Sequence, residues 1–332
     1  MNKLQSKIYL APFQGITGAV YREVYSRHFP YLDKLFTPFF TSIYKHKSLV
    51  SKVGELEQTH HLGIPVVPQV LSNNADEIIR FGNICYEMGF KEINWNLGCP
   101  FKRVAAKKRG SGLLPHPELV KQILEIAMAE IPIKLSVKCR LGYDSPTEIF
   151  ELLPIFEDYG ISELIIHARL GKQIYKGEVD IQTFDQVCEM SHLNIVYNGD
   201  IFSQADFQKY NSQFENIENW MIGRGLLVDP FLPSDIKEIE TIDAEERKTL
   251  AYKFIIDLYL AYRKKLNNRL HAISLMKELW EYMSYSFDKP GKVFSKIKKT
   301  KSFDEYEDAV KKVFDDYYWV GSSAKQFSSS SI

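Results

Sequence analysis

The chain has 332 residues, of which 45% are hydrophobic and 25% are charged, and its formal net charge at pH 7 is zero. This is the composition of an ordinary globular protein, which excludes a disordered or collagen-like chain. The length exceeds the roughly 250 residues at which a single core stops growing, so we expect one large domain and one small one.

The sequence has no run of about 18 apolar residues, so no membrane span is expected. The N-terminal segment 1–7 is short and polar and does not have the pattern of a signal peptide. The four cysteines, Cys85, Cys99, Cys139 and Cys188, show no CxxC spacing, which argues against a zinc site and against a disulfide framework. We therefore expect a cytoplasmic protein with no metal site and no obligate protein partner.

Over the first 225 residues, short apolar runs alternate with longer amphipathic ones. The apolar runs are rich in β-branched and aromatic residues, as in strands that are buried on both faces. The predicted strands are 8–12, 34–39, 66–70, 92–96, 134–139, 163–167, 195–198 and 220–222. The predicted helices between them include 74–88, 117–130 and 147–159. Asn74 is expected to cap the first of these helices, and Pro117 to lie in the first turn of the second.

Eight strands with intervening helices predict a (β/α)8 TIM barrel. A doubly wound sheet is the alternative, but the GxGxxG fingerprint that favours it does not follow the first strand. From about residue 243 strand-like runs stop, and helical periodicity follows at 244–266, 270–285 and 303–318. The segment 288–291 (DKPG) is a turn signal between the last two helices.

We therefore predict a catalytic barrel over 1–242, a small all-helical domain over 243–321 and a Ser-rich disordered tail over 322–332. Residues 247–301 contain 14 Lys and Arg against 4 Asp and Glu. Such a local excess of positive charge is either a footprint for a polyanion or a solvated helical surface.

Polar and basic residues recur at the ends of the predicted strands. Active sites of TIM barrels form at the carboxyl ends of the strands, so these positions predict a site. They include Pro12, Phe13, Gln69, Asn96, Cys99, Lys138, Arg140, His167, Arg169, Asn198, Gly199, Asp200, Gly223 and Arg224. At the last two strand ends, glycine turns beside Arg224 suit a phosphate, and ordinary strand-to-helix turns are the alternative.

Cys99 lies between Gly98 and Pro100, which direct the turn into the predicted mouth of the barrel, whereas the other cysteines are expected in the core. A thiol there serves as a nucleophile or as a general acid, and its protonation at neutral pH favours the acid. The loop 101–115 that follows predicts either a mobile lid that meets phosphates or a solvated basic loop. Its positive charges are Lys102, Arg103, Lys107, Lys108 and Arg109.

Two further residues have open alternatives. Lys138 at the end of a buried strand needs an anion or an electron-rich ring, such as a reduced flavin, unless a neighbouring carboxylate pairs with it. His167 is either a core histidine bonded to a carbonyl or a donor to a flavin or phosphate.

The segment 94–100 (NWNLGCP) resembles the signature of the tRNA-dihydrouridine synthases. Further motifs agree in order over residues 8–230, and the helical part matches the family's tRNA-binding domain in position and length. These motifs are 11–13 (APF), 68–69 (PQ), 136–142 (SVKCRLG), 167–169 (HAR), 175–177 (YKG), 198–200 (NGD) and 223–225 (GRG). Three places depart from the family pattern. Phe13 replaces a common methionine, Gly18 replaces a common aspartate, and 107–112 (KKRGSG) is rearranged.

The resemblance implies non-covalent FMN at the barrel mouth, reduction of the FMN by NADPH, and reduction of specific uridines in the tRNA D-loop to 5,6-dihydrouridine. Hydride then passes from N5 of the reduced FMN to C6 of the uracil, and Cys99 protonates C5. Asn96 is expected near the uracil. The implied RNA contacts are Arg140, Arg169, Lys107, Lys108 and Arg109. The implied cofactor contacts are Pro12, Phe13, Gln69, Lys138, His167, Asn198, Gly199, Asp200, Gly223 and Arg224.

Two other functions fit part of the pattern. An FMN-dependent TIM-barrel reductase of a small pyrimidine or enone would need neither the basic tail nor the basic loop. An inactive RNA-binding protein with the same fold would not need Cys99 together with the whole flavin set. We therefore expect the tRNA-modifying enzyme.

Overall fold

The computed structural model describes residues 6–43, 54–56, 63–266 and 269–321, and the predicted tail at 322–332 lies outside them. Within these ranges no helix is long and apolar enough to cross a membrane. The same ranges contain no group of three or more His, Cys, Asp or Glu residues that could hold a metal ion.

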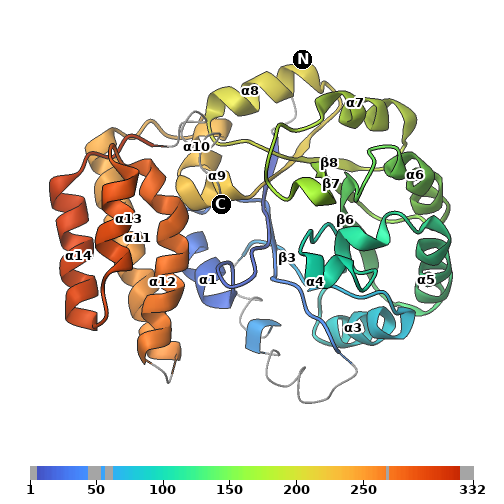
Figure 1. Ribbon diagram of the computed structural model, residues 1–332, viewed down its shortest axis with the longest axis horizontal. Coiled ribbons are helices and arrows are strands. Elements are labelled where there is room, and N and C mark those ends of the chain that lie inside the picture. Colours follow the sequence, from blue (N-terminus) through green and yellow to red (C-terminus); the bar gives the residue numbers. More distant parts are fainter. Residues whose placement is uncertain (1–5, 44–53, 57–62, 267–268, 322–332) are drawn as a thin grey trace.

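The strands form one parallel sheet that closes into a barrel with helices around it (Figure 1). Its order is β3-β2-β1-β9-β8-β7-β6-β5-β4, and β3 and β4 are two halves of one predicted strand separated by Pro68. Proline has no N–H to donate to a ladder, which explains the interruption. The strands are β1 (Lys7–Leu10), β2 (Lys34–Phe36), β3 (Val66–Val67), β4 (Gln69–Val70), β5 (Glu92–Leu97), β6 (Lys134–Gly142), β7 (Leu164–Leu170), β8 (Ile195–Asn198) and β9 (Asn219–Ile222). The predicted TIM barrel is confirmed.

The helices that follow the strands cover the outside of the barrel (Figure 1). They are α1 (Ala19–His28), α3 (Ala75–Glu87), α5 (Pro117–Glu130), α6 (Glu148–Asp158), α7 (Ile181–Met190), α8 (Gln204–Gln213), α9 (Arg224–Val228) and α10 (Leu232–Lys237). Asn74 caps α3 by accepting a hydrogen bond from the N–H of Glu77 at 3.0 Å, and Pro117 lies in the first turn of α5, as predicted.

Four further helices stand together on one side of the barrel (Figure 1). They are α11 (Ala244–Lys265), α12 (Arg269–Met283), α13 (Pro290–Lys298) and α14 (Phe303–Asp316). Helix α13 was expected only as a turn, but a proline fits the first turn of a helix, where its missing N–H has no partner to lose. The ring of Phe254 on α11 packs against Tyr25 and Phe29 of the barrel side, and one apolar core spans both parts. The division into two domains therefore stays a prediction.

The amino ends of the strands are closed by a buried network of charges. The Nζ atom of Lys34 lies 2.9 Å from Oε2 of Glu163 and 3.2 Å from Oε2 of Glu92. The hydroxyl of Tyr9 donates to Oε1 of Glu163 at 3.0 Å. Burial raises the pKa of Glu163 above its usual value, although the charge of Lys34 opposes the shift. In TIM barrels this face serves stability rather than chemistry.

We predict that Lys34→Met lowers the free energy of unfolding by about 3–5 kcal/mol at pH 7.5, because two carboxylates then lose their buried counter-charge. The loss should shrink toward pH 5. A carboxyl with a raised pKa destabilises the fold while it is charged, and lowering the pH through that pKa neutralises it. Urea unfolding at both pH values measures this.

The matched control is Lys296→Met, which removes an exposed ion pair with Asp316 and should cost less than about 1 kcal/mol. An equal loss for Lys34→Met and the control, or an unchanged loss at pH 5, would contradict the prediction.

Candidate active site

A cavity of about 400 Å³ opens at the carboxyl ends of the strands, and a smaller one of about 70 Å³ lies beside the ends of β8 and β9. The two share lining residues and form one cleft. Of the predicted site residues, those that line the cleft are Pro12, Phe13, Gln69, Asn96, Cys99, Lys138, Arg140, His167, Asn198, Gly199, Asp200, Gly223 and Arg224. Arg169, Lys107, Lys108 and Arg109 are not in its lining. The structure thus brings most of the predicted site into one place.

The backbone around Cys99 is held on both sides. Oδ1 of Asn96 accepts hydrogen bonds from the N–H groups of Gly98 at 3.0 Å and Cys99 at 2.9 Å. The carbonyl of Cys99 accepts from Ser111, at 3.1 Å from its N–H and at 2.9 Å from its hydroxyl. Gly110 has a φ of +56°, and a Cβ there would lie 2.8 Å from Cβ of Cys99. The thiol therefore has a fixed place at the mouth.

The basic segment after Cys99 is folded rather than open. It forms α4 (Lys102–Ala105) and a short 3-10 helix, η1 (Gly110–Leu113), whose residues are buried. A Cβ at Gly112 would lie 2.3 Å from the carbonyl oxygen of Ala105, so this glycine permits close packing. The segment is thus built of two short helices, and whether it serves as a lid that meets phosphates stays a prediction. Lys107 and Lys108 are exposed, and Arg109 donates to Oδ1 of Asn73 at 3.0 Å.

A chain of buried amides links the two strands that carry Gln69 and Asn96. Nδ2 of Asn96 donates to Oε1 of Gln69 at 2.7 Å, and Nε2 of Gln69 donates to Oδ1 of Asn94 at 2.8 Å. Nδ2 of Asn94 then donates to the hydroxyl of Ser136 at 2.9 Å. Because Oδ1 of Asn96 already accepts two backbone N–H groups, the orientation of each amide follows from the one before. Our sequence analysis missed Asn94 and Ser136 as supports, although polar residues inside buried strands are a signal.

Two cations of the cleft, Lys138 and Arg140, have no carboxylate partner among the described residues. Nζ of Lys138 donates to Oδ1 of Asn198 at 2.9 Å, and in the described part of the chain no ion pair of Lys138 is found. Burial lowers the pKa of Lys138 to about 8, and the nearby charge of Arg140 adds to the shift. Burial also lowers the pKa of Arg140 to about 10. Both shifts are typical of cations that lack an anionic partner, so the carboxylate alternative for Lys138 is not supported.

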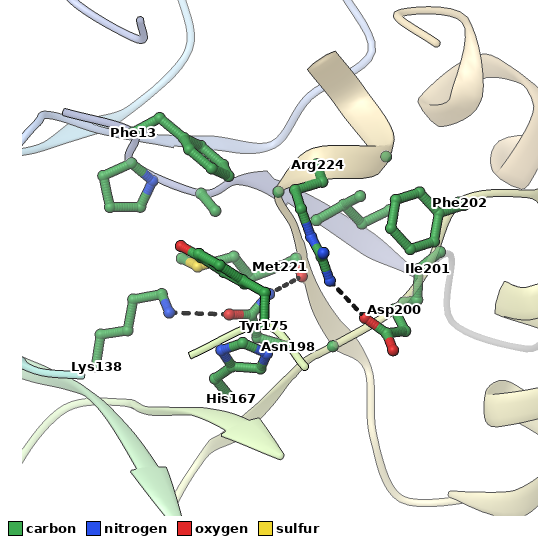
Figure 2. A pocket seen from close by; sticks show the side chains of 16 residues that line it. Phe13, Lys138, His167, Tyr175, Asn198, Asp200, Ile201, Phe202, Met221 and Arg224 are labelled. Atoms are coloured by element: carbon green, nitrogen blue, oxygen red, sulfur yellow. Dashed lines mark hydrogen bonds and ion pairs between the residues drawn. The ribbon is translucent and has the colours of Figure 1, made fainter. Parts of the chain in front are cut away.

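Asp200 joins two arginines at the end of the cleft beside β8 and β9. Its Oδ1 lies 2.8 Å from Nη2 of Arg224 (Figure 2). The same Oδ1 lies 2.8 Å from Nη1 of Arg169, and Oδ2 pairs with Nη2 of Arg169 at 2.5 Å. Asp200 adopts a φ of +40°, which residues other than glycine seldom adopt. Its carboxylate therefore positions the two guanidinium groups. Arg169 is 2% exposed behind it, so its contact with RNA stays a prediction.

His167 is 8% exposed, and its Nε2 lies 3.4 Å from Nη1 of Arg169. A guanidinium only donates, so Nε2 accepts and the proton resides on Nδ1. Burial, followed by the charges of Arg140 and Lys138, holds the pKa of His167 well below its usual value. The side chain is therefore a neutral donor at pH 7. In Figure 2 His167, Lys138 and Arg224 point toward the same space.

Aromatic and acidic residues that our sequence analysis gave no role complete the walls. The ring of Tyr175 lies 4.8 Å from the guanidinium carbon of Arg224 and 5.7 Å from that of Arg140. Helix α12 contributes three further residues: Glu278, Glu281 and Tyr282. Their spacing of three and four places them on one helix face, which is the signal that could have indicated a shared surface.

Two of the departures from the family pattern are accommodated locally. The ring of Phe13 packs edge-on against Tyr282, with centroids 6.0 Å apart, so it still forms a wall of the cleft. Gly18 precedes α1 without a capping side chain. Oε2 of Glu55 accepts from the N–H of Ala19 at 2.7 Å and takes the place of that cap.

Comparison with known proteins agrees with this geometry. The family model described as dihydrouridine synthase (Dus) matches residues 9–320. The tRNA-dihydrouridine synthase B of Pasteurella multocida is 33% identical over 235 residues, which cover 69% of this chain and 68% of that protein. The tRNA-dihydrouridine(16) synthase of Neisseria meningitidis serogroup A is 26% identical, over 91% of this chain and 93% of that protein.

Solved structures of similar fold include a morphinone reductase, with a TM-score of 0.53 and 9% identity over 74% of this chain and 88% of that chain. The old yellow enzyme of Trypanosoma cruzi has a TM-score of 0.51 and 9% identity over 75% of this chain and 94% of that chain. At this identity the likeness concerns the barrel fold alone. The family model matches well over half of the length of this chain. The chain therefore belongs to the dihydrouridine synthase family.

Proposed function

We propose that the protein is a flavin-dependent tRNA-dihydrouridine synthase, which reduces the C5–C6 double bond of D-loop uridines to 5,6-dihydrouridine. The observation that carries the proposal is a thiol on a fixed backbone at the mouth of a cleft lined by Lys138 and Arg140, in a chain of this family. The relatives compared above are themselves named as tRNA-dihydrouridine synthases. A tRNA substrate also fits the cytoplasmic setting that the sequence suggests.

The residues of the cleft fit FMN in charge and shape. Burial lowers the pKa values of Lys138 and Arg140, so an anionic ligand would stabilise their charged forms. A cavity of about 400 Å³ suits an aromatic ligand. Bound FMN, reduced by NADPH, would supply a hydride to C6 of the uracil. Gln69, Lys138 and His167 would contact the ring. Pro12 and Phe13 would form one wall, and the phosphate end would be held by Asn198, Gly199, Gly223 and Arg224, with Asp200 positioning Arg224.

Cys99 would hold the proton that the reaction needs. Hydride addition at C6 moves negative charge toward C5 and O4, so a donor at C5 completes the reduction. Burial raises the pKa of the Cys99 thiol above its usual value, and the N–H of Phe101 and the charge of Arg140 oppose the shift. The thiol is thus protonated at neutral pH. Arg140 also favours the thiolate that remains after the proton has left, and Asn96 would face the uracil.

The positive surface favours RNA over a small substrate. Residues 247–301 carry ten more positive than negative charges, 14 against 4. We propose the helical part, 243–321, as the tRNA-binding domain beside the catalytic barrel at 1–242. Arg140, Arg169, Lys107, Lys108 and Arg109 are the proposed RNA contacts on the barrel. A reductase of a small pyrimidine or enone would have no use for this charge.

The first test is nucleoside mass spectrometry of unmodified tRNA after incubation with the protein, FMN and NADPH. We expect dihydrouridine from the native protein and a fall of roughly 10²- to 10⁴-fold in rate for Cys99→Ala, the usual contribution of a general acid. Flavin binding and its reduction by NADPH should be unchanged. Cys188→Ala, on α7, is the matched control. Native protein with bound flavin but no dihydrouridine would refute the proposed function, and full activity of Cys99→Ala would refute the acid.

The raised pKa of Cys99 predicts that the rate at which tRNA oxidises the reduced enzyme falls at alkaline pH. The rate constant for oxidation of the reduced enzyme by tRNA should stay constant from pH 6 to 8. It should fall as the pH rises through the thiol pKa, because the thiolate has no proton to give. Cys99→Ser should remove this decrease, since a hydroxyl does not ionise in the range. Single-turnover kinetics at each pH measure this rate constant. If the decrease at alkaline pH persists in Cys99→Ser, a group other than Cys99 causes it.

Lys138 predicts a pH dependence of flavin affinity. With its pKa at about 8, the side chain is charged below pH 8 and neutral above it. The dissociation constant of FMN should therefore rise above pH 8, where the positive charge is lost. Lys138→Met should weaken binding roughly 10- to 100-fold at pH 7, as for a lost charge-assisted hydrogen bond, and should abolish the pH effect. Fluorescence titration of the apoprotein measures both, and a pH effect that persists in Lys138→Met contradicts the assignment.

A further inference from the structure

Phe101 is a large apolar side chain that is half exposed at the edge of the cleft. Among the large hydrophobic side chains that the described part of the chain leaves exposed, Phe101 alone lines it. Tyr86 on α3 and Ile126 on α5, for example, lie on outer helices. A single exposed apolar residue is ordinary on a protein surface. The place of this ring at the rim of the cleft is what makes it available to contact a ligand.

The backbone holds Phe101 in a fixed relation to the thiol. Its carbonyl accepts from the N–H groups of Val104 at 2.8 Å and Ala105 at 3.0 Å, which begins α4. Its own N–H lies toward the sulfur of Cys99 and lowers the pKa of that thiol. Pro100 between them restricts the chain further. Two residues span at most about 7 Å, so a base at the Phe101 ring is a near neighbour of the base at the thiol.

The charges around Phe101 select the kind of ligand. The guanidinium carbon of Arg103 lies 6.0 Å from the centre of the ring, and Lys102 is exposed beside it. The cleft is also lined by the carboxylates of Glu278 and Glu281 on α12. An aromatic face flanked by cations is the arrangement that binds single-stranded nucleic acid, in which the bases stack and the phosphates meet positive charge.

We propose that Phe101 stacks on the tRNA base next to the target uridine and so selects the substrate. The inference rests on the proposed function. A uridine that enters the cleft leaves its neighbour without a stacking partner, and the ring of Phe101 replaces that partner. Arg103 and Lys102 bind the adjoining phosphates, while the carboxylates of Glu278 and Glu281 repel them. The strand is thereby laid along the side of the cleft that carries Cys99.

The test compares Phe101→Leu, which keeps the apolar size but not the planar face, with Phe101→Tyr, which keeps the ring. The matched control is Tyr86→Leu, another exposed aromatic residue that lies away from the cleft. Three quantities are measured for each variant: kcat/KM for dihydrouridine formation in unmodified tRNA, the dissociation constant of that tRNA, and the rate constant for flavin reduction by NADPH. Circular dichroism and thermal unfolding show that each variant is folded.

We expect Phe101→Leu to lower kcat/KM and to weaken tRNA binding roughly tenfold, the change that corresponds to one base stacked on one ring. Phe101→Tyr and Tyr86→Leu should stay within about twofold of the native protein, and flavin reduction should be unchanged in all three. These results together support the inference.

Native values for tRNA in Phe101→Leu would overturn it, as would an equal loss in Phe101→Tyr. A slower flavin reduction in Phe101→Leu would overturn it too, because the ring would then serve the nicotinamide. If the native protein formed no dihydrouridine, the proposed function would fail by itself, and the tRNA dissociation constants would still decide whether the ring binds RNA.

Discussion

The hydrogen bonds from the N–H groups of Gly98 and Cys99 to Oδ1 of Asn96 are the constraint on which the rest of the site depends. They turn the chain at the end of β5 and place the thiol at the mouth of the barrel. Because they occupy the side-chain oxygen of Asn96, its amide nitrogen donates to Gln69. This bond in turn sets the orientation of the Gln69 amide, which donates to Asn94. A single choice of orientation thus sets a proposed acid and a proposed flavin contact on neighbouring strands. Buried networks of this kind are rigid because every alternative leaves a polar group without a partner.

The two ends of the barrel differ in how their buried lysines are paired. At the amino ends, Lys34 lies between two carboxylates, so its charge is paired within the fold. At the carboxyl ends, Lys138 has a neutral amide as its partner and Arg140 has backbone carbonyls, with their pKa values lowered accordingly. At the mouth, Lys138 and Arg140 thus form no ion pair within the described residues. An anionic or electron-rich ligand that binds there would interact favourably with both charges, so one barrel can combine a stable fold with a ligand site.

Much of this molecule was predictable from the sequence because strands buried on both faces have a strong signature. All eight predicted strands are present, one of them interrupted at Pro68, and the residues that follow them line the cleft. Differences arose where one residue type serves two purposes. Pro290 begins a helix where a turn was predicted, and the glycines of the basic segment after Cys99 lie in a packed short helix, with Gly112 against Ala105. No local pattern could distinguish these uses, because each is decided by what lies opposite in space.

The wall formed by α12 was not predicted from the sequence, because a shared helix face does not show which cleft it lines, and it bears on how the two parts of the chain work together. Tyr282 meets Phe13 of the barrel in the cleft, while α11 packs its Phe254 against the aromatic residues of α1. A single apolar core runs through both contacts, so the helices cannot shift as a body without disturbing the cleft. Closely packed interiors transmit such displacements rather than absorb them. A tRNA bound on the proposed basic surface would therefore be held at a fixed distance from the thiol.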